Sequence, residues 1–146
     1  MYEPVKYIHA IWGIISLLLL LITVINVILG YSGNRTFGAN DKKLSLFTLI
    51  AAHIQFIIGI VLYINSPLGL AVFGQMKDAS LRLTSLEHPL VSLIAIVLIT
   101  IGWSKHKKQF ESKMQFKTFA IFYGIALLVI LSRLPWALLM DVLRSF

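Results

Sequence analysis

The chain has 146 residues, of which 58% are apolar and 13% are charged, and its mean hydropathy is +0.87. A soluble domain is only about 45 to 50% apolar, so this composition excludes an ordinary soluble protein and indicates helices that lie in lipid. Cysteine is absent, which excludes disulfides, iron–sulfur clusters, thiolate zinc sites and a covalently attached c-type haem.

Four segments are long and apolar enough to cross a bilayer, which takes about 20 residues at about 1.5 Å per residue. We expect these spans at about residues 5–30, 44–65, 86–104 and 116–134. The first apolar run is too long for a secretion signal, whose apolar core has about 7 to 15 residues. Residues 1–146 are therefore predicted to form one transmembrane domain, an all-α antiparallel four-helix bundle in the membrane.

The first span carries small and polar residues on one helical face. Positions three and four residues apart hold His9, Gly13, Ser16, Leu20 and Thr23. Histidine is costly in lipid and small residues let helices approach closely, so this face is expected to point into the bundle.

The second span has His53 near its middle, about 13 to 15 Å deeper than the outer helix ends by the helical rise. At that depth it does not share a ligand with a histidine at the outer end of another helix. Two interpretations remain open for His53, a cofactor contact and an interhelical hydrogen bond.

The second connector contains an apolar stripe typical of a short amphipathic segment at the outer surface, made of Met76, Ala79, Leu83 and Leu86. It is expected either to cover the bundle as a lid or to pack on it without a gating role.

The third span begins with His88, and its inward face is expected to hold His88, Ser92, Ala95, Ile99 and Gly102. In an up-and-down bundle the first and third helices are diagonal neighbours and start on the same side, so His9 and His88 lie at one depth. Two level imidazoles on diagonal helices can each approach one face of a haem. We therefore predict His9 and His88 as axial ligands of its iron.

Glu87 and two arginines accompany His88. Thr84 and Glu87 match a capping box, and Glu87 can alternatively balance Arg133 at the end of the fourth span. Arg133 and Arg82 are candidate partners of haem propionates, while Arg133 can also reach for the membrane interface. His106, among the lysines of the third connector, is expected to face solvent and is set aside as a ligand.

The net charge of +7 is concentrated in the first and third connectors, a distribution that argues against nucleic-acid binding. By the positive-inside rule these connectors are cytoplasmic, and both termini lie outside. Carboxylates are missing from the middle of every span, which excludes a di-iron cage, and no phosphate loop, nucleophile elbow or zinc-protease motif is present. An electron carrier is therefore favoured over a catalyst.

Four stretches carry a resemblance to a known family: "YIHAIWG", "AAHIQFIIGIVLYINSP", "LRLTSLEHPL" and "FYGIALLVILSRLPW". Across nearly its whole length the chain resembles the small four-helix bacterial membrane proteins labelled cytochrome b-like. More distantly it resembles one half of haem A synthase, through a histidine opening one helix, Gln55 and Gly59 in the next, and a histidine opening the third. The chain lacks that enzyme's outer-loop cysteines.

The resemblance implies a non-covalent haem b between His9 and His88, in the inner membrane of a bacterium. The leading interpretation is a multi-pass b-type cytochrome that exchanges electrons with a quinone or a redox protein. Two alternatives remain: a structural or assembly subunit of a larger respiratory complex, and a protein that handles haem or quinone as cargo, with His53 and Arg133 contacting it.

Overall fold

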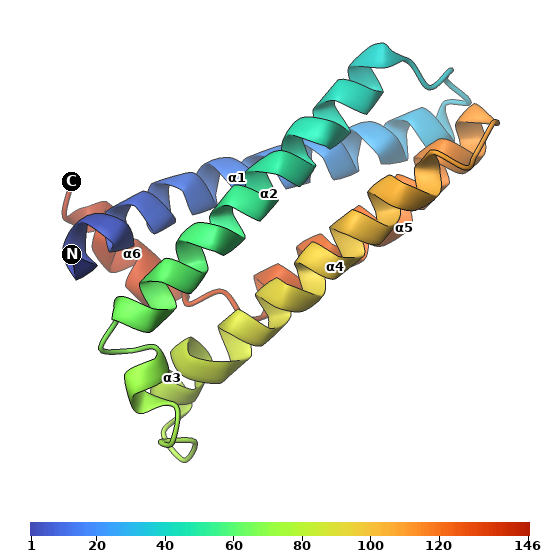
Figure 1. Cartoon of the computed structure of the whole chain (residues 1–146). Coiled ribbons are helices and arrows are strands. Elements are labelled where there is room, and N and C mark those ends of the chain that lie inside the picture. Colours follow the sequence, from blue (N-terminus) through green and yellow to red (C-terminus); the bar gives the residue numbers. More distant parts are fainter.

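The structure, a computed structural model, describes residues 1–146. It is all-α, and four long helices run antiparallel (Figure 1). They are α1 (Tyr2–Ser32), α2 (Ala39–Asn65), α4 (His88–His106) and α5 (Ser112–Ser132). Each of the four helical segments is long and apolar enough to cross a membrane. The predicted four-helix bundle is confirmed.

The helices follow one another around the bundle. Helix α1 packs against α2 and α5, and α4 packs against α5 and α2, so α1 and α4 face each other diagonally as predicted. The small and polar faces point inward, because Ser16 and Thr23 on α1 and Ala95 and Gly102 on α4 are buried. The outer faces carry exposed isoleucine and leucine, as expected for contact with lipid chains.

The amphipathic segment before the third span differs from its expected form. Residues 79–106 are one helical segment, in which α3 (Ala79–Arg82) continues through a π-helical turn (Leu83–Glu87) into α4. The only regular structure earlier in the connector is a 3₁₀ turn, Leu70–Val72. The stripe from Ala79 onward is thus the extended start of the third span rather than a separate surface helix.

The predicted capping box at Thr84 is wrong, because the helix begins earlier. Asp78 is the N-cap, and its Oδ1 accepts a hydrogen bond from the backbone N–H of Leu81 at 3.0 Å. Thr84 lies inside the helical segment and donates to the Leu81 carbonyl at 3.2 Å. Glu87 is therefore free of any capping role.

The apolar core occupies only one part of the bundle. It extends from the middle to the end formed by residues 33–38 and 107–111, which we call the connector end. Its members are Leu20, Val24, Val27, Ala95, Ile99, Phe116, Phe119, Tyr123, Ala126 and Leu127. Toward the opposite end, which we call the terminal end, the helices spread apart (Figure 1).

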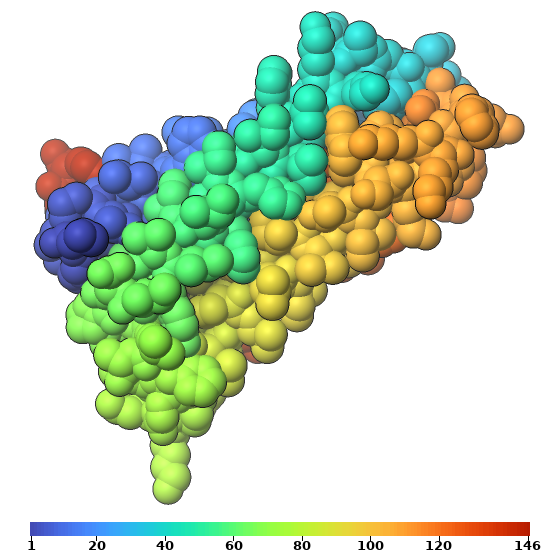
Figure 2. Space-filling view, in the orientation of Figure 1, coloured from blue at the N-terminus to red at the C-terminus, as the bar shows by residue number.

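A last helix, α6 (Trp136–Arg144), was not expected from the sequence. It starts after Pro135 and returns along the start of α1, so the two chain ends lie close together (Figure 1). The ring centroids of Tyr7 and Phe146 are 5.4 Å apart, and Val142 is buried. The space-filling view shows an elongated molecule in which the connector between α2 and α3 protrudes at the terminal end (Figure 2).

Candidate functional site

His9 and His88 come together at the terminal end of the bundle. Their ring centroids are 6.4 Å apart, and their planes make an angle of 86°. Two imidazoles on opposite faces of one iron have ring centres about 6.3 Å apart, since each nitrogen lies about 2.0 Å from the metal and about 1.15 Å from its ring centre. The distance between the two ring centres is therefore compatible with two imidazoles on one iron.

Helix α2 holds the His9 ring from one side. The Gln55 side-chain amide donates to the His9 carbonyl at 3.0 Å, and its Nε2 lies 3.2 Å from His9 Nδ1. One turn further along α2, Gly59 leaves room for the ring, because a Cβ at this position would lie 3.1 Å from His9 Cε1. Gly13 leaves room for the Gln55 side chain in the same way, because a Cβ at Gly13 would lie only 2.7 Å from Gln55 Nε2.

Gln55 also leaves an unsatisfied acceptor at this place. Its Oε1 is buried and has no hydrogen-bond partner, the only buried side-chain atom of the chain in that state. An unpaired buried acceptor costs about 1 to 3 kcal/mol. Such an atom calls for a partner that the protein itself does not supply.

His88 is oriented by the end of the fourth span. Its Nδ1 donates to the Arg133 carbonyl at 3.1 Å, which leaves Nε2 as the nitrogen free to act as a ligand. Metal-binding histidines are usually fixed in this way, through a hydrogen bond from the second ring nitrogen to a carbonyl. The π-helical turn directly precedes His88, and such turns concentrate at functional sites.

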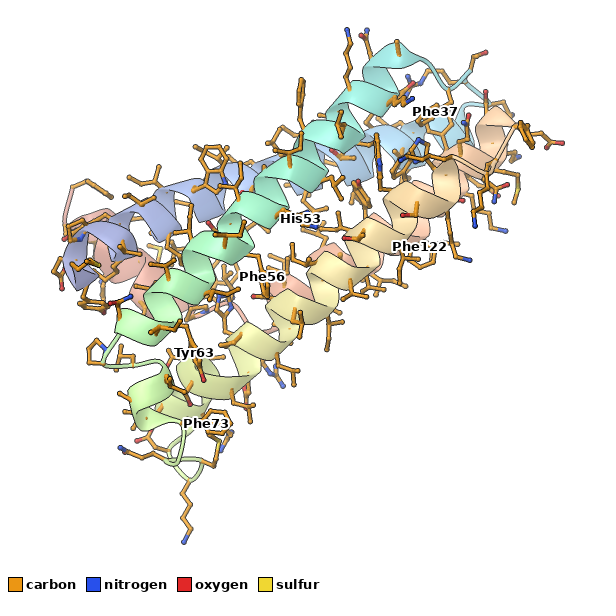
Figure 3. All side chains as sticks on the ribbon, viewed as in Figure 1. Phe37, His53, Phe56, Tyr63, Phe73 and Phe122 are labelled. Atoms are coloured by element: carbon orange, nitrogen blue, oxygen red, sulfur yellow. The ribbon has the colours of Figure 1, made fainter.

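Tyr63 contacts the π-helical turn, a role that was not expected from the sequence. Its hydroxyl donates to the Ser85 carbonyl at 2.9 Å, an acceptor that lies within the turn. Figure 3 shows Tyr63 near the end of α2, opposite the start of the third span. A tyrosine near a span end is common in membrane proteins, so no signal in the sequence marked this one.

Glu87 joins the two predicted arginines. Arg82 Nε lies 2.8 Å from one carboxylate oxygen and Arg133 Nε lies 3.2 Å from the other. Of the two roles considered for Glu87, the structure supports the balance with Arg133. Two cations share one carboxylate here, so the cluster keeps one positive charge beside His88, suited to an anionic group of a ligand.

His53 does not reach the His9 and His88 pair. Its Nδ1 donates to the Leu49 carbonyl at 2.7 Å, and its Nε2 lies 3.3 Å from Thr100 Oγ1 on α4. Figure 3 shows it in the middle of α2, at the side that faces α4. Its contacts are those of an interhelical hydrogen bond, and Gln55, two residues on, points instead to His9.

The donor set restricts which metal group would fit. No three histidine or carboxylate side chains gather anywhere in the chain, so side chains alone do not form a metal cage. Two imidazoles suit an iron whose remaining ligands arrive with a porphyrin. Gly59 leaves room beside the His9 ring, and the large buried aromatic side chains of the core lie toward the other end of the bundle. The residues present fit a haem.

His106 contradicts the expectation of a solvent-facing side chain. It is only 2% exposed and packs 4.6 Å from the rings of both Trp103 and Phe119. The lysines around it suggested solvent, but Phe37 and Phe119, from elsewhere in the chain, cover the ring.

The comparisons with known proteins leave these residues to be judged by their geometry. No protein-family model, no curated protein and no solved structure matches the chain.

Proposed function

We propose that this protein is an integral-membrane b-type cytochrome whose haem is held by His9 and His88. The separation of 6.4 Å between the two rings carries the proposal, because it comes from residues 79 positions apart on diagonal helices. A haem with two imidazole ligands has no open coordination position and so supplies one-electron transfer rather than oxygen chemistry.

The surrounding side chains have separate parts in this proposal. The Arg133 carbonyl fixes the His88 ring, and Gln55 and Gly59 position His9. Arg133 and Arg82 provide positive charge for propionates at the helix ends. His53 is assigned a structural part, because both of its ring nitrogens have partners within the protein.

The orientation belongs to the same proposal. The connector end carries most of the lysines, which supports a cytoplasmic position for this end in a bacterial cell and a position of the histidine pair near the outer side of the inner membrane. The electron partner would then be a quinone in the bilayer or a redox protein outside it. Because the chain has no cysteine, single cysteines at Lys108 and Lys77 can be labelled with an impermeant maleimide, and reaction at Lys108 in intact cells would reverse the orientation.

The visible spectrum of the detergent-purified protein tests the haem assignment. We expect a Soret band, a sharp α-band on reduction and one haem per chain by the pyridine assay. His9→Ala and His88→Ala should each abolish these bands, whereas His53→Ala should retain them. A colourless wild-type protein that haem does not reconstitute would support a structural subunit, and haem that is lost on dilution would support a cargo carrier.

A further inference from the structure

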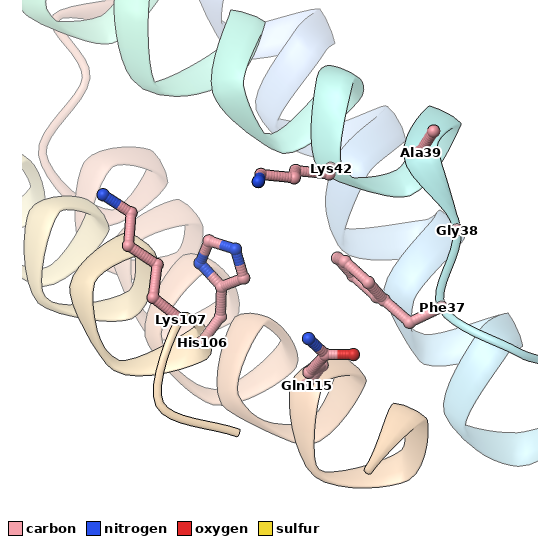
Figure 4. A pocket seen from close by; sticks show the side chains of 7 residues that line it. All are labelled: Phe37, Gly38, Ala39, Lys42, His106, Lys107 and Gln115. Carbon is pink, nitrogen blue, oxygen red and sulfur yellow. The ribbon is translucent and has the colours of Figure 1, made fainter. Parts of the chain in front are cut away.

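A second polar site lies at the connector end, away from the histidine pair. It is a surface pocket of about 340 Å³, in the size range of small-molecule sites (Figure 4). Three parts of the chain meet there, the start of α2, the end of α4 and the first turn of α5. The lining residues are Phe37, Gly38, Ala39, Lys42, His106, Lys107 and Gln115.

The pocket carries positive charge without a matching carboxylate. Neither Lys42 nor Lys107 takes part in any of the five ion pairs of the chain. The nearby Asp41 is engaged elsewhere, by Arg35 at 3.0 Å and Asn26 at 2.8 Å. Neither lysine is therefore neutralised by a carboxylate of the protein, and the contact of Lys107 Nζ with the Trp103 ring, at 5.3 Å, brings no negative charge.

His106 is the second observation that points to a ligand. Its Nδ1 donates to the Trp103 carbonyl, and the surrounding aromatic rings hold it in place. The remaining nitrogen, Nε2, has no partner within the protein although the residue is only 2% exposed. Figure 4 shows the ring between Lys42 and Lys107 at the wall of the pocket. Because Nε2 is not among the enclosed atoms of the protein, it is reached from the pocket, where it can accept a hydrogen bond from a polar group.

The position in the fold identifies the source of that group. Helix α2 begins at Ala39, α4 ends at His106 and α5 begins at Ser112, so the pocket lies where the apolar spans end. Lipid phosphates occupy this level of a bilayer, and basic pockets between spans bind anionic head groups. Trp103 beside the pocket is at the depth where tryptophan is enriched.

We propose that this pocket binds the head group of an anionic phospholipid, with Lys42 and Lys107 neutralising the phosphate. Nδ1 of His106 carries the proton that it donates to the Trp103 carbonyl, so Nε2 of the neutral ring is a hydrogen-bond acceptor. An acceptor suits a head-group hydroxyl such as that of a phosphoglycerol. The Gln115 amide can donate to a phosphate oxygen. The proposal is independent of the haem, which belongs to the other end of the bundle.

Lipid retention measured by native mass spectrometry tests the proposal. The detergent-solubilised protein is equilibrated with phosphatidylglycerol, phosphatidic acid or phosphatidylcholine of the same acyl chains. We expect the wild type to retain phosphatidylglycerol selectively. Lys42→Gln and Lys107→Gln should each weaken retention about fivefold, since a lysine near an anionic head group contributes about 1 kcal/mol. His106→Phe keeps the aromatic packing and should lower the preference for phosphatidylglycerol over phosphatidic acid, which lacks the hydroxyl.

The matched control for each of these single variants is a single change of a neighbouring lysine outside the pocket, Lys43→Gln or Lys108→Gln, which removes the same charge from the same end of the bundle. Each control should retain phosphatidylglycerol like the wild type. An equal loss of lipid retention in the pocket and control variants would overturn the proposal in favour of diffuse electrostatic attraction. Equal retention of phosphatidylglycerol and phosphatidylcholine by the wild-type protein would overturn it as well. Inorganic phosphate that displaces the lipid and stabilises the protein as strongly would assign the pocket to a soluble phosphate and overturn the lipid source.

Discussion

The two ends of the bundle are built from different kinds of side chain. At the connector end, Phe116, Phe119 and Tyr123 are fully buried between the helices. Toward the terminal end the fully buried side chains are small, namely Ser85, Ala95 and Ala126, and the histidine pair lies between the helices. The comparison indicates that packing at one end stabilises the bundle, so that the other end can carry polar groups that folding alone does not favour.

The charges divide in the same way. The terminal end holds five basic and four acidic residues, whereas the connector end holds eight basic residues and two acidic ones. The basic residues of the connector end are Arg35, Lys42, Lys43, Lys105, Lys107, Lys108, Lys113 and Lys117. Nearly all of the net charge is thus at the connector end, the end for which we propose a cytoplasmic position and contact with anionic lipids.

The largest expected effect tests whether the packed end provides the stability. Phe119→Ala removes a fully buried ring, and we expect the free energy of unfolding to fall by about 2 kcal/mol, mainly from the cavity left behind. Leu128→Ala, on the lipid-facing side of the same helix, should have little effect. Unfolding in dodecyl sulfate followed by circular dichroism measures both. Equal losses in the two variants would show that the aromatic core does not set the stability.

The sequence was sufficient for the spans, because lipid requires each helix to satisfy its own backbone over a fixed thickness. It also placed His9 and His88 at one depth, since the helical rise converts residue number into height. The burial of His106 was not predictable in this way, because Phe37 lies 69 residues away and covers the ring only in the folded chain.

Two further features depend on tertiary contacts. From the sequence, Glu87 could contact either the nearby Thr84 in a capping box or the distant arginines, and the sequence did not favour one over the other. In the structure Glu87 ends the π-helical turn and forms an ion pair with Arg133. Helix α6 has only nine residues and one buried side chain. An apolar pattern of this length does not predict a stable helix by itself, because a short helix depends on packing, here against α1. By contrast, Gln55 and Gly59, noticed through the family resemblance, both touch His9.

The next prediction concerns the space at the terminal end. Gly59→Leu would push against the His9 ring, and overpacking of this kind costs about 1 to 3 kcal/mol, so we expect roughly tenfold weaker haem binding. Gly124→Leu is the control, because an added side chain meets open space there. Haem titration of both apoproteins, followed at the Soret band, measures the difference. Unchanged affinity in Gly59→Leu would show that the His9 ring need not keep its position.

The smallest expected effect separates His53 from the histidine pair. A hydrogen bond between membrane helices is worth about 0.6 kcal/mol, so a double-mutant cycle of His53→Ala with Thr100→Val should give a coupling near that value. The haem spectrum should survive in all three variants, because His53 lies toward the middle of α2, away from the pair. Both ring nitrogens of His53 already have partners within the protein. Loss of the haem spectrum in His53→Ala alone would therefore require a different pair of ligands. The proposed division between a packed connector end and a haem-binding terminal end would then no longer hold.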